Sequence, residues 1–300
     1  MPNKEEIVNF FKRLQDIICV ELEIADGKGK FQEDVWTHKT GGGGRTRLIQ
    51  NGNILEKGGV NFSAVEGSLG EDMKKALKIN EDADFFATGI SIVQHPENPM
   101  VPIIHMNVRY FELSNGTYWF GGGIDLTPHY LNENQASWFH KQLKAVCDKH
   151  GVNYYSEYKK KADDYFYLPH REETRGVGGI FFDHLNEKSL GISKADIFDF
   201  IKDLGNEFAP IYTHLMTLNA DIPFTERNKS WQYLRRGRYV EFNLVWDRGT
   251  KFGLVTGGRT ESILMSLPPQ AQWEYCHEVE PNSEEEKTQN ALKKGIDWII

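Results

Sequence analysis

Residues 91–130 read SIVQHPENPMVPIIHMNVRYFELSNGTYWFGGGIDLTPHY. From Ile104 to Glu112 apolar and polar residues alternate, and this period of two is typical of a β-strand. One face of the predicted strand is apolar, and the other carries His105, Asn107, Arg109 and Phe111. Alternate side chains of a strand stand about 7 Å apart on one face. The stretch therefore predicts a row of polar groups over a buried apolar surface.

A second strand is predicted from Thr117 to Gly121, after the turn residues Ser-Asn-Gly. It runs into three glycines and then Asp125, so the hairpin would bring Asp125 to the same surface as His105 and Arg109. The alternative is a solvated face of an edge strand. Such faces favour Lys, Glu and Thr, which this row lacks.

The rest of the chain alternates between strand and helix patterns. Strands are expected over Ala87–His95, Tyr239–Asp247, Phe252–Val255 and Ser262–Leu267. Helices are expected over Ile7–Leu22, Asp72–Leu77 and Gln135–His150. Two more are expected, one that begins at the capping box of Ser193 with Asp196 and one that begins at the capping residue Ser283. Pro210 is expected to kink or split the helix after Ser193. We predict an α+β protein with a large, mostly antiparallel sheet flanked by helices on both faces. Since no linker divides the chain, residues 1–300 are predicted to form a single domain.

Composition restricts the class of function. The net charge is −8 and the pI is near 5.7, which disfavours a nucleic-acid partner because a phosphate backbone requires a basic surface. The three cysteines, at positions 19, 147 and 276, have no metal or iron–sulfur spacing, and they fit a reducing compartment. No apolar run approaches 18 residues, so no membrane span is expected. The N-terminal residues lack the pattern of a signal or transit peptide, and a cytoplasmic location is therefore expected.

The glycine run after Thr40 has two interpretations. Four glycines suggest a phosphate cradle, but no Gly-Lys-Ser/Thr follows, so the run is not a P-loop. A flexible turn before a strand is the preferred interpretation.

Several blocks of the sequence resemble one family. They are HMNVRYF at 105–111, WFGGGIDLTP at 119–128 and YFYLPHREETRGVGGIFFDH at 165–184. These blocks are similar to the oxygen-dependent coproporphyrinogen III oxidases, and the resemblance extends from about Gly41 to Tyr275. It implies a single domain with a curved antiparallel sheet between helical layers. It also implies a homodimer that associates through about residues 239–275.

The resemblance implies a reaction as well. The substrate, coproporphyrinogen III, is a reduced tetrapyrrole with four propionates, and two of these become vinyl groups with loss of CO₂. O₂ is the oxidant and protoporphyrinogen IX is the product. Because the porphyrinogen is itself an electron-rich reductant, no metal or organic cofactor is expected to be required.

Arginine suits the recognition of such a polyanion, because its planar fork pairs with a carboxylate through two hydrogen bonds and keeps its charge. Arg109, Arg175 and Arg259 lie in the matching blocks and are predicted to line the substrate cleft. The backbone N–H groups of Gly257 and Gly258 are candidate donors to a propionate.

Four further polar residues complete the predicted site. Ser91 and Asn107 can donate or accept hydrogen bonds in the same region. Asp125 is expected to accept from the pyrrole N–H groups and to take up a proton. His105, on the same strand face as Arg109, is the second candidate for proton transfer.

Two other classes of function remain open from the residues alone. The first is a non-haem metal oxygenase that uses His95, His105, His140 and His170, although no pair of these has a tight ligand spacing. The second is a tetrapyrrole carrier without chemistry. Asp125 argues against the carrier, because an added negative charge would weaken the binding of a tetra-anion.

Overall fold

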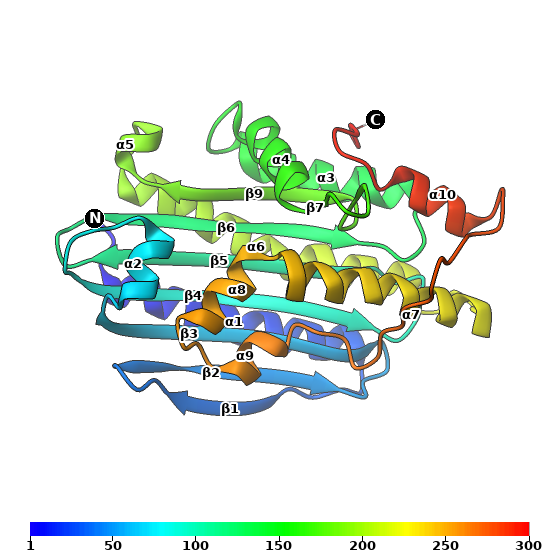
Figure 1. The fold of residues 1–300 in the computed structure, drawn as a ribbon, viewed down its shortest axis with the longest axis horizontal. Coiled ribbons are helices and arrows are strands. Elements are labelled where there is room, and N and C mark those ends of the chain that lie inside the picture. The colour runs from blue at the N-terminus through cyan, green and yellow to red at the C-terminus, as the bar shows by residue number, and fades with distance from the viewer. Residues whose placement is uncertain (300) are drawn as a thin grey trace.

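The computed structural model describes residues 1–299. Seven antiparallel strands form one sheet in the order β1-β2-β3-β4-β5-β6-β9 (Figure 1). Their bounds are β1 Gln32–Thr37, β2 Gly42–Gln50, β3 Leu55–Ser68, β4 Asp84–Pro96, β5 Ile103–Leu113, β6 Tyr118–Thr127 and β9 Gly178–Leu185. The short strands β7 (Tyr167–Leu168) and β8 (Glu173–Thr174) pair separately.

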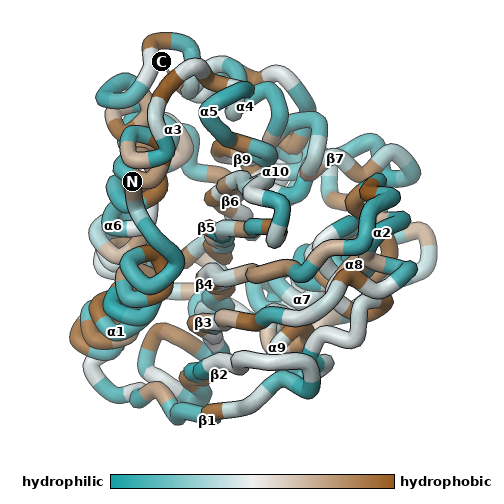
Figure 2. Tube along the Cα trace, turned by 90° about the vertical axis from the view of Figure 1, so that its left-hand side faces the viewer, coloured by the Kyte–Doolittle hydropathy of each residue, from teal (hydrophilic) through white to brown (hydrophobic). Residues whose placement is uncertain are grey.

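Helices cover both faces of the sheet, so the molecule has three layers (Figure 2). One face carries α1 Lys4–Asp26, α3 Glu133–Asp148 and α6 Lys194–Asn219. The other carries α2 Glu71–Leu77, α7 Glu226–Glu241, the π-helix η1 Phe242–Trp246, α8 Arg248–Val255 and α9 Thr260–Leu264. The remaining helices, α4 Tyr154–Tyr165, α5 Glu187–Leu190 and α10 Glu284–Ala291, lie near β9 and the C-terminus. The predicted α+β class is confirmed.

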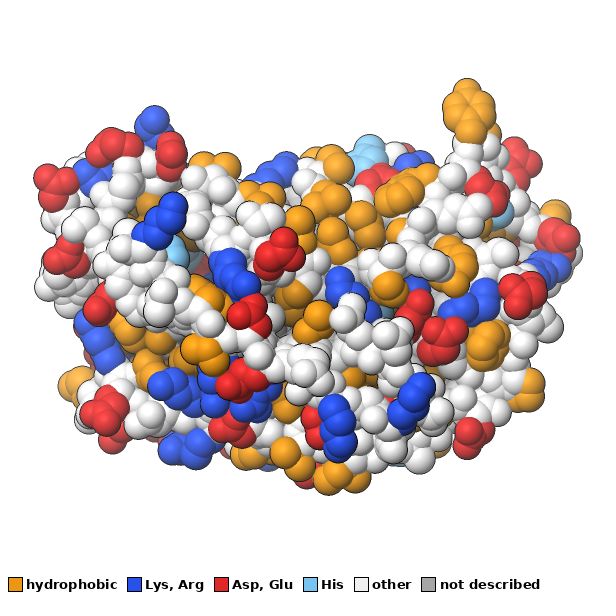
Figure 3. All heavy atoms as spheres, turned by 90° about the horizontal axis from the view of Figure 1, so that it is seen from below, with side chains coloured by type: hydrophobic (Ala, Val, Ile, Leu, Met, Phe, Trp, Pro, Cys, Tyr) orange, Lys and Arg blue, Asp and Glu red, His pale blue; other side chains and the backbone are white. Residues whose placement is uncertain are grey.

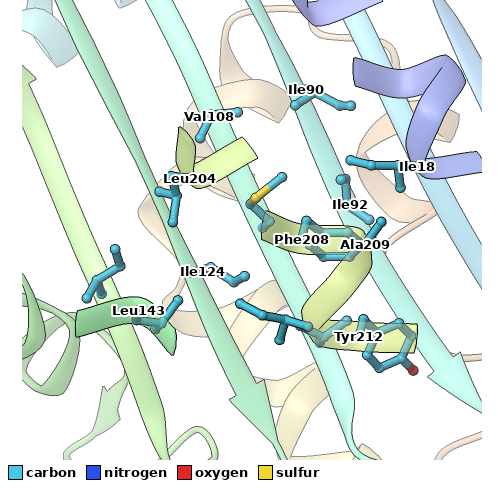
Figure 4. Packing of buried hydrophobic residues seen from close by; sticks show 14 of the residues in the cluster. Ile18, Ile90, Ile92, Val108, Ile124, Leu143, Leu204, Phe208, Ala209 and Tyr212 are labelled. Atoms are coloured by element: carbon cyan, nitrogen blue, oxygen red, sulfur yellow. The ribbon is translucent and has the colours of Figure 1, made fainter. Parts of the chain in front are cut away.

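The hydrophobic core lies between the sheet and helices α1, α3 and α6. Leu204, Phe208 and Tyr212 of α6 pack onto Ile92 of β4 and Val108 of β5 (Figure 4), and all five side chains are almost wholly buried. The predicted helices over this face are present, including the capping box of Ser193 with Asp196. Pro210 does not split α6, which is helical throughout its 26 residues.

The hairpin predicted around residue 115 is present. β5 and β6 pair antiparallel, with His105 opposite Asp125 and Arg109 opposite Gly121. The turn closes with a hydrogen bond from the Leu113 N–H to the Thr117 carbonyl. Gly116 has a φ of 85°, a left-handed conformation that glycine adopts without steric cost.

The strands predicted after residue 238 are wrong. Tyr239–Asp247, Phe252–Val255 and Ser262–Leu267 fall in helices α7 to α9 and in the segments that join them. The buried side of α7 mixes the apolar Trp231, Leu234 and Val240 with the polar Gln232, Arg235 and Arg236, so polar residues interrupt its apolar stripe. The apolar residues that follow alternate with polar ones along the sequence although they do not form a strand. The π-helical turn over Phe242–Trp246 also changes the residue spacing from that of a regular α-helix.

Candidate active site

The second face of the sheet has an open polar surface, which we call the polar floor: Asn61, Ser63, Ser91, Asn107 and Arg109. These residues lie on β3, β4 and β5, in the middle of the sheet, and all are partly exposed. Interior strands that were fully covered by helices would bury them. The helical layer of α7, α8 and α9 therefore leaves these residues partly accessible to solvent, although Asn61 Nδ2 donates to the Ser262 carbonyl of α9 at 2.7 Å.

Glycine keeps one end of the polar floor flat. A Cβ atom added at Gly121 would lie 2.5 Å from the Asp183 Oδ1 atom and 3.0 Å from the Arg109 Nε atom. Any side chain there would displace both groups. Arg109 instead lies across Gly121, with Nη2 2.9 Å from Asp183 and Nη1 donating to Asn107 Oδ1 at 2.9 Å.

Asp125 lies beside the polar floor but is sealed from solvent, with its side chain 0% exposed. Its Oδ1 atom accepts from His105 Nδ1 at 2.7 Å and from Arg175 Nη2 at 2.7 Å. Its Oδ2 atom accepts from Arg175 Nε at 3.1 Å and Nη2 at 2.9 Å. Burial raises the pKa of Asp125, but the charge of Arg175 and the hydrogen bond from His105 outweigh burial and hold this pKa below its ordinary value.

Arg175 is enclosed by aromatic rings. Its Cζ atom lies 4.4 Å from the ring centroid of Phe166, 4.6 Å from that of Phe242 and 5.0 Å from that of Tyr239. Its Nη1 atom donates to Asn243 Oδ1 at 3.3 Å. Burial lowers the pKa of Arg175, but Asp125 outweighs it and raises this pKa. The guanidinium binds Asp125, so the geometry does not support the predicted contact of Arg175 with a propionate.

His105 is the member of this group that reaches solvent, with 22% of its side chain exposed. Because Asp125 is an ionised acceptor, we assign the proton of the neutral imidazole to Nδ1, which donates to the carboxylate. The Nε2 atom then carries the lone pair, and Arg175 Nη2 also lies 3.3 Å from Nδ1.

Arg259 lies over the edge strand β1, with the polar floor between it and Arg109 in the strand order. It begins helix α9, its Nη2 atom lies 2.5 Å from Asp34 of β1, and its Nη1 atom lies 3.4 Å from Ser262 Oγ. Gly257 and Gly258 form the turn before it. The Gly258 N–H donates to the Gly253 carbonyl at 2.8 Å, so in this structure it is not free to bind a propionate as predicted.

Besides His105, the three other histidines of the metal hypothesis each contact a different part of the protein. His95 contacts the Ser266 carbonyl, His140 contacts Val177, and His170 pairs with Glu241. In the described part of the chain, no group of three or more His, Cys, Asp or Glu side chains is arranged to hold a metal ion.

Residues from the C-terminal third of the chain also surround Arg175, and the sequence analysis did not identify them. Asn243 and Phe242 lie in the π-helix η1, an element often found at functional sites. Asp247 accepts from Tyr165 OH at 2.6 Å and caps α8 through the Thr250 N–H at 2.7 Å. The sequence did contain an indication of these residues, because the polar Asn243 and Asp247 interrupt a run of aromatic and aliphatic residues.

Comparison with known proteins gives a consistent result. The family model described as coproporphyrinogen III oxidase matches residues 6–298. The oxygen-dependent coproporphyrinogen-III oxidase of Glycine max, described as chloroplastic, is 47% identical over 96% of this chain and 77% of its own length. The mitochondrial enzymes of Homo sapiens and Rattus norvegicus are 47% and 48% identical over the whole chain, which covers 67% and 69% of their lengths.

Proposed function

This chain belongs to the coproporphyrinogen III oxidase family, and we propose that it converts two propionates of coproporphyrinogen III to vinyl groups, with O₂ as oxidant, in haem biosynthesis. The observation that carries the proposal is the polar floor between Arg109 and Arg259, with the His105–Asp125–Arg175 group beside it. These two arginines offer cations at two separate places to a substrate that carries four carboxylates.

The substrate contacts follow from the positions of the exposed groups. Arg109 and Arg259 are 38% and 30% exposed in their side chains, and each can exchange its aspartate partner for a propionate. Ser91 and Asn107 lie between them on the polar floor. The Gly257 backbone remains a candidate donor in the turn beside Arg259.

We further propose that the reaction requires neither a metal nor an organic cofactor. The test is turnover of coproporphyrinogen III by protein stripped with a chelator, in air and under nitrogen. Formation of protoporphyrinogen IX only in air supports the proposal. Activity that is lost on stripping and restored by one divalent ion would instead favour the metal oxygenase. Binding without product in air would favour the carrier.

The homodimer is proposed on an exposed apolar surface. Leu244, Val245 and Trp246 of η1 and Leu254 and Val255 of α8 are exposed. Figure 3 shows hydrophobic side chains gathered on the upper side of the view, where the α8–α9 layer lies. Exposed apolar groups of this extent are typical of interaction surfaces, and a second copy would cover them by two-fold symmetry.

A cytoplasmic location remains a proposal. It is supported by free cysteines at positions 19, 147 and 276. In the part of the chain that the structure describes, no helix has both the length and the apolar character needed to cross a membrane. The relatives named above are chloroplastic or mitochondrial. Cell fractionation with an antibody against this chain would locate the protein.

A further inference from the structure

The glycine run after Thr40 forms part of strand β2, rather than the flexible turn expected before a strand. Gly44 has no room for a side chain, because a Cβ atom there would lie 2.5 Å from Cζ2 of Trp36 and 2.4 Å from the carbonyl oxygen of Phe62. The indole of Trp36 therefore lies directly against the backbone of β2. Glycine within a strand weakens it and often marks a close approach of this kind.

Trp36 is also held at the edge of its ring. Its Nε1 atom donates to Thr46 Oγ1 at 3.2 Å, and Thr46 shares a hydrogen bond of 3.0 Å with Ser262 of helix α9. The guanidinium carbon of Arg259, the residue before α9, lies 6.0 Å from the centroid of the indole, within the range of a cation–π contact. The ring is thus fixed in place, although it stays partly exposed on an edge strand.

Trp36 shares a face of the sheet with the polar floor. Residues directly opposite one another on neighbouring strands project to the same face, and the row that begins at Trp36 continues through Gly44, Ser63 and Gly89 to Arg109. The three residues between the two ends have no side chain larger than that of serine. Four strand spacings separate β1 from β5, or about 19 Å. The row therefore has an aromatic ring at one end and an arginine at the other.

Resting on the reaction proposed above, we propose that Trp36 is a substrate-binding residue, which contacts the pyrrole ring whose propionate Arg259 binds. An indole offers its apolar face and its edge to another aromatic ring, and the guanidinium beside it suits the carboxylate arm of that ring. The spacing sets the size of the ligand. A single pyrrole cannot reach from Trp36 to Arg109 across about 19 Å, whereas a tetrapyrrole with extended carboxylate arms can. The alternative is that Trp36 only packs β1 onto β2.

Contact with the substrate can be observed without turnover, because the proposed oxidant is absent under nitrogen. Protein labelled with fluorotryptophan should give one ¹⁹F resonance for each of its seven tryptophans, and Trp36→Phe identifies that of Trp36. Coproporphyrinogen III added under nitrogen should shift the Trp36 resonance. Trp138 is the internal control, since it lies on α3 and contacts His214 of α6, on the opposite face of the sheet. Its resonance should not move.

Replacement of the ring gives the size of the effect. Trp36→Leu should raise the Kd for coproporphyrinogen III under nitrogen, and KM in air, by roughly 5- to 150-fold, the range found when a ring that stacks on a nucleobase is removed. The kcat should change little, because a contact made equally in the ground and transition states alters KM alone. Trp36→Phe keeps a ring and should bind more tightly than Trp36→Leu. Val35→Ala is the matched control on β1, since Val35 is exposed and projects to the other face, and it should bind as wild type does.

Two results would overturn the inference. They are an unmoved Trp36 resonance at saturating substrate, and a folded Trp36→Leu protein that binds substrate as tightly as wild type. A lower urea midpoint with an unchanged Kd is the second of these results, and it is what packing of β1 alone predicts. If Trp36→Leu does not fold, the fluorine spectra of the wild-type chain decide. Failure of the proposed function looks different, because wild type would then form no protoporphyrinogen IX in air, while the spectra under nitrogen still report whether the tetrapyrrole contacts Trp36.

Discussion

Replacing Arg175 with Met should destabilise the protein strongly. The change leaves the Asp125 carboxylate buried, with only the hydrogen bond from His105. Removing one partner of a buried ion pair typically costs about 3–5 kcal/mol, because the other charge stays desolvated and unpaired. Asp125→Asn should cost a similar amount, since it strands the guanidinium. With both partners replaced, neither charge is left alone, and the loss should be well below the sum of the two single losses.

Urea unfolding at pH 7 of wild type, both single variants and the double variant gives the coupling free energy directly. We expect at least about 2 kcal/mol of coupling. The matched control is Arg109→Met, which breaks the pair with Asp183. That pair is 38% and 33% exposed in its side chains, so its loss should cost no more than about 1 kcal/mol. Additive losses for Arg175 and Asp125, or an equal loss for Arg109, would refute the reasoning.

The same pair predicts a pH dependence. Because the pKa of Asp125 is held below its ordinary value of 3.8, the unfolded chain takes up the proton first as the pH falls. The stabilisation is therefore complete above pH 3.8 and is lost as the pH drops through the lower folded value. In Asp125→Asn/Arg175→Met, the loss of stability that protonation of Asp125 causes should be absent. If this variant lost as much stability at acidic pH as wild type does, the lowered pKa of Asp125 would be contradicted.

Three further predictions concern other parts of the molecule. Arg259→Ala should weaken substrate binding by about 1.5–3 kcal/mol, the value of one charge-assisted contact, and an unchanged KM and kcat would exclude Arg259 from the site. Burial lowers the pKa of His140 from 6.5 to about 4, so stability should fall between those pH values as the unfolded chain takes up the proton. His140→Gln should flatten that region of the urea-midpoint profile, and an identical profile would refute the assignment. Light scattering should show wild-type protein as a dimer of 34.5 kDa subunits. Val245→Arg should be a monomer or an aggregate, and a monomeric wild type would disprove the dimer.

The β5–β6 hairpin could be predicted from the sequence because its signals are local. Alternation of period two, a Ser-Asn-Gly turn and a stretch of glycines determine which side chains share a face, and they placed His105, Arg109 and Asp125 correctly. The helices of the core face were predictable for the same reason, because their apolar stripes and caps lie within a few turns of each other.

The layer above the polar floor was not predictable in the same way. Helix α7 turns Gln232, Arg235 and Arg236 inward, so the usual relation between burial and apolar character fails there. The partner of Arg175 was also hidden, since Asp125 lies 50 residues earlier in the chain. A glycine-rich loop with arginine fits both a propionate and a buried aspartate, and only the three-dimensional arrangement distinguishes them.

The buried ion pair has a consequence for the order in which the nascent chain acquires its structure. The strands from β1 to β6 are consecutive neighbours, so they can pair as they leave the ribosome. Arg175 follows Asp125 by 50 residues, and Asn243 follows Arg175 by 68. At about 5–20 residues per second, the carboxylate waits roughly 3–10 s for its arginine and a further 3–14 s or so for the amide. During translation the polar floor and the Asp125 carboxylate beside it thus face water, and the Ser and Asn residues of the floor give the incomplete sheet a polar face that does not promote aggregation.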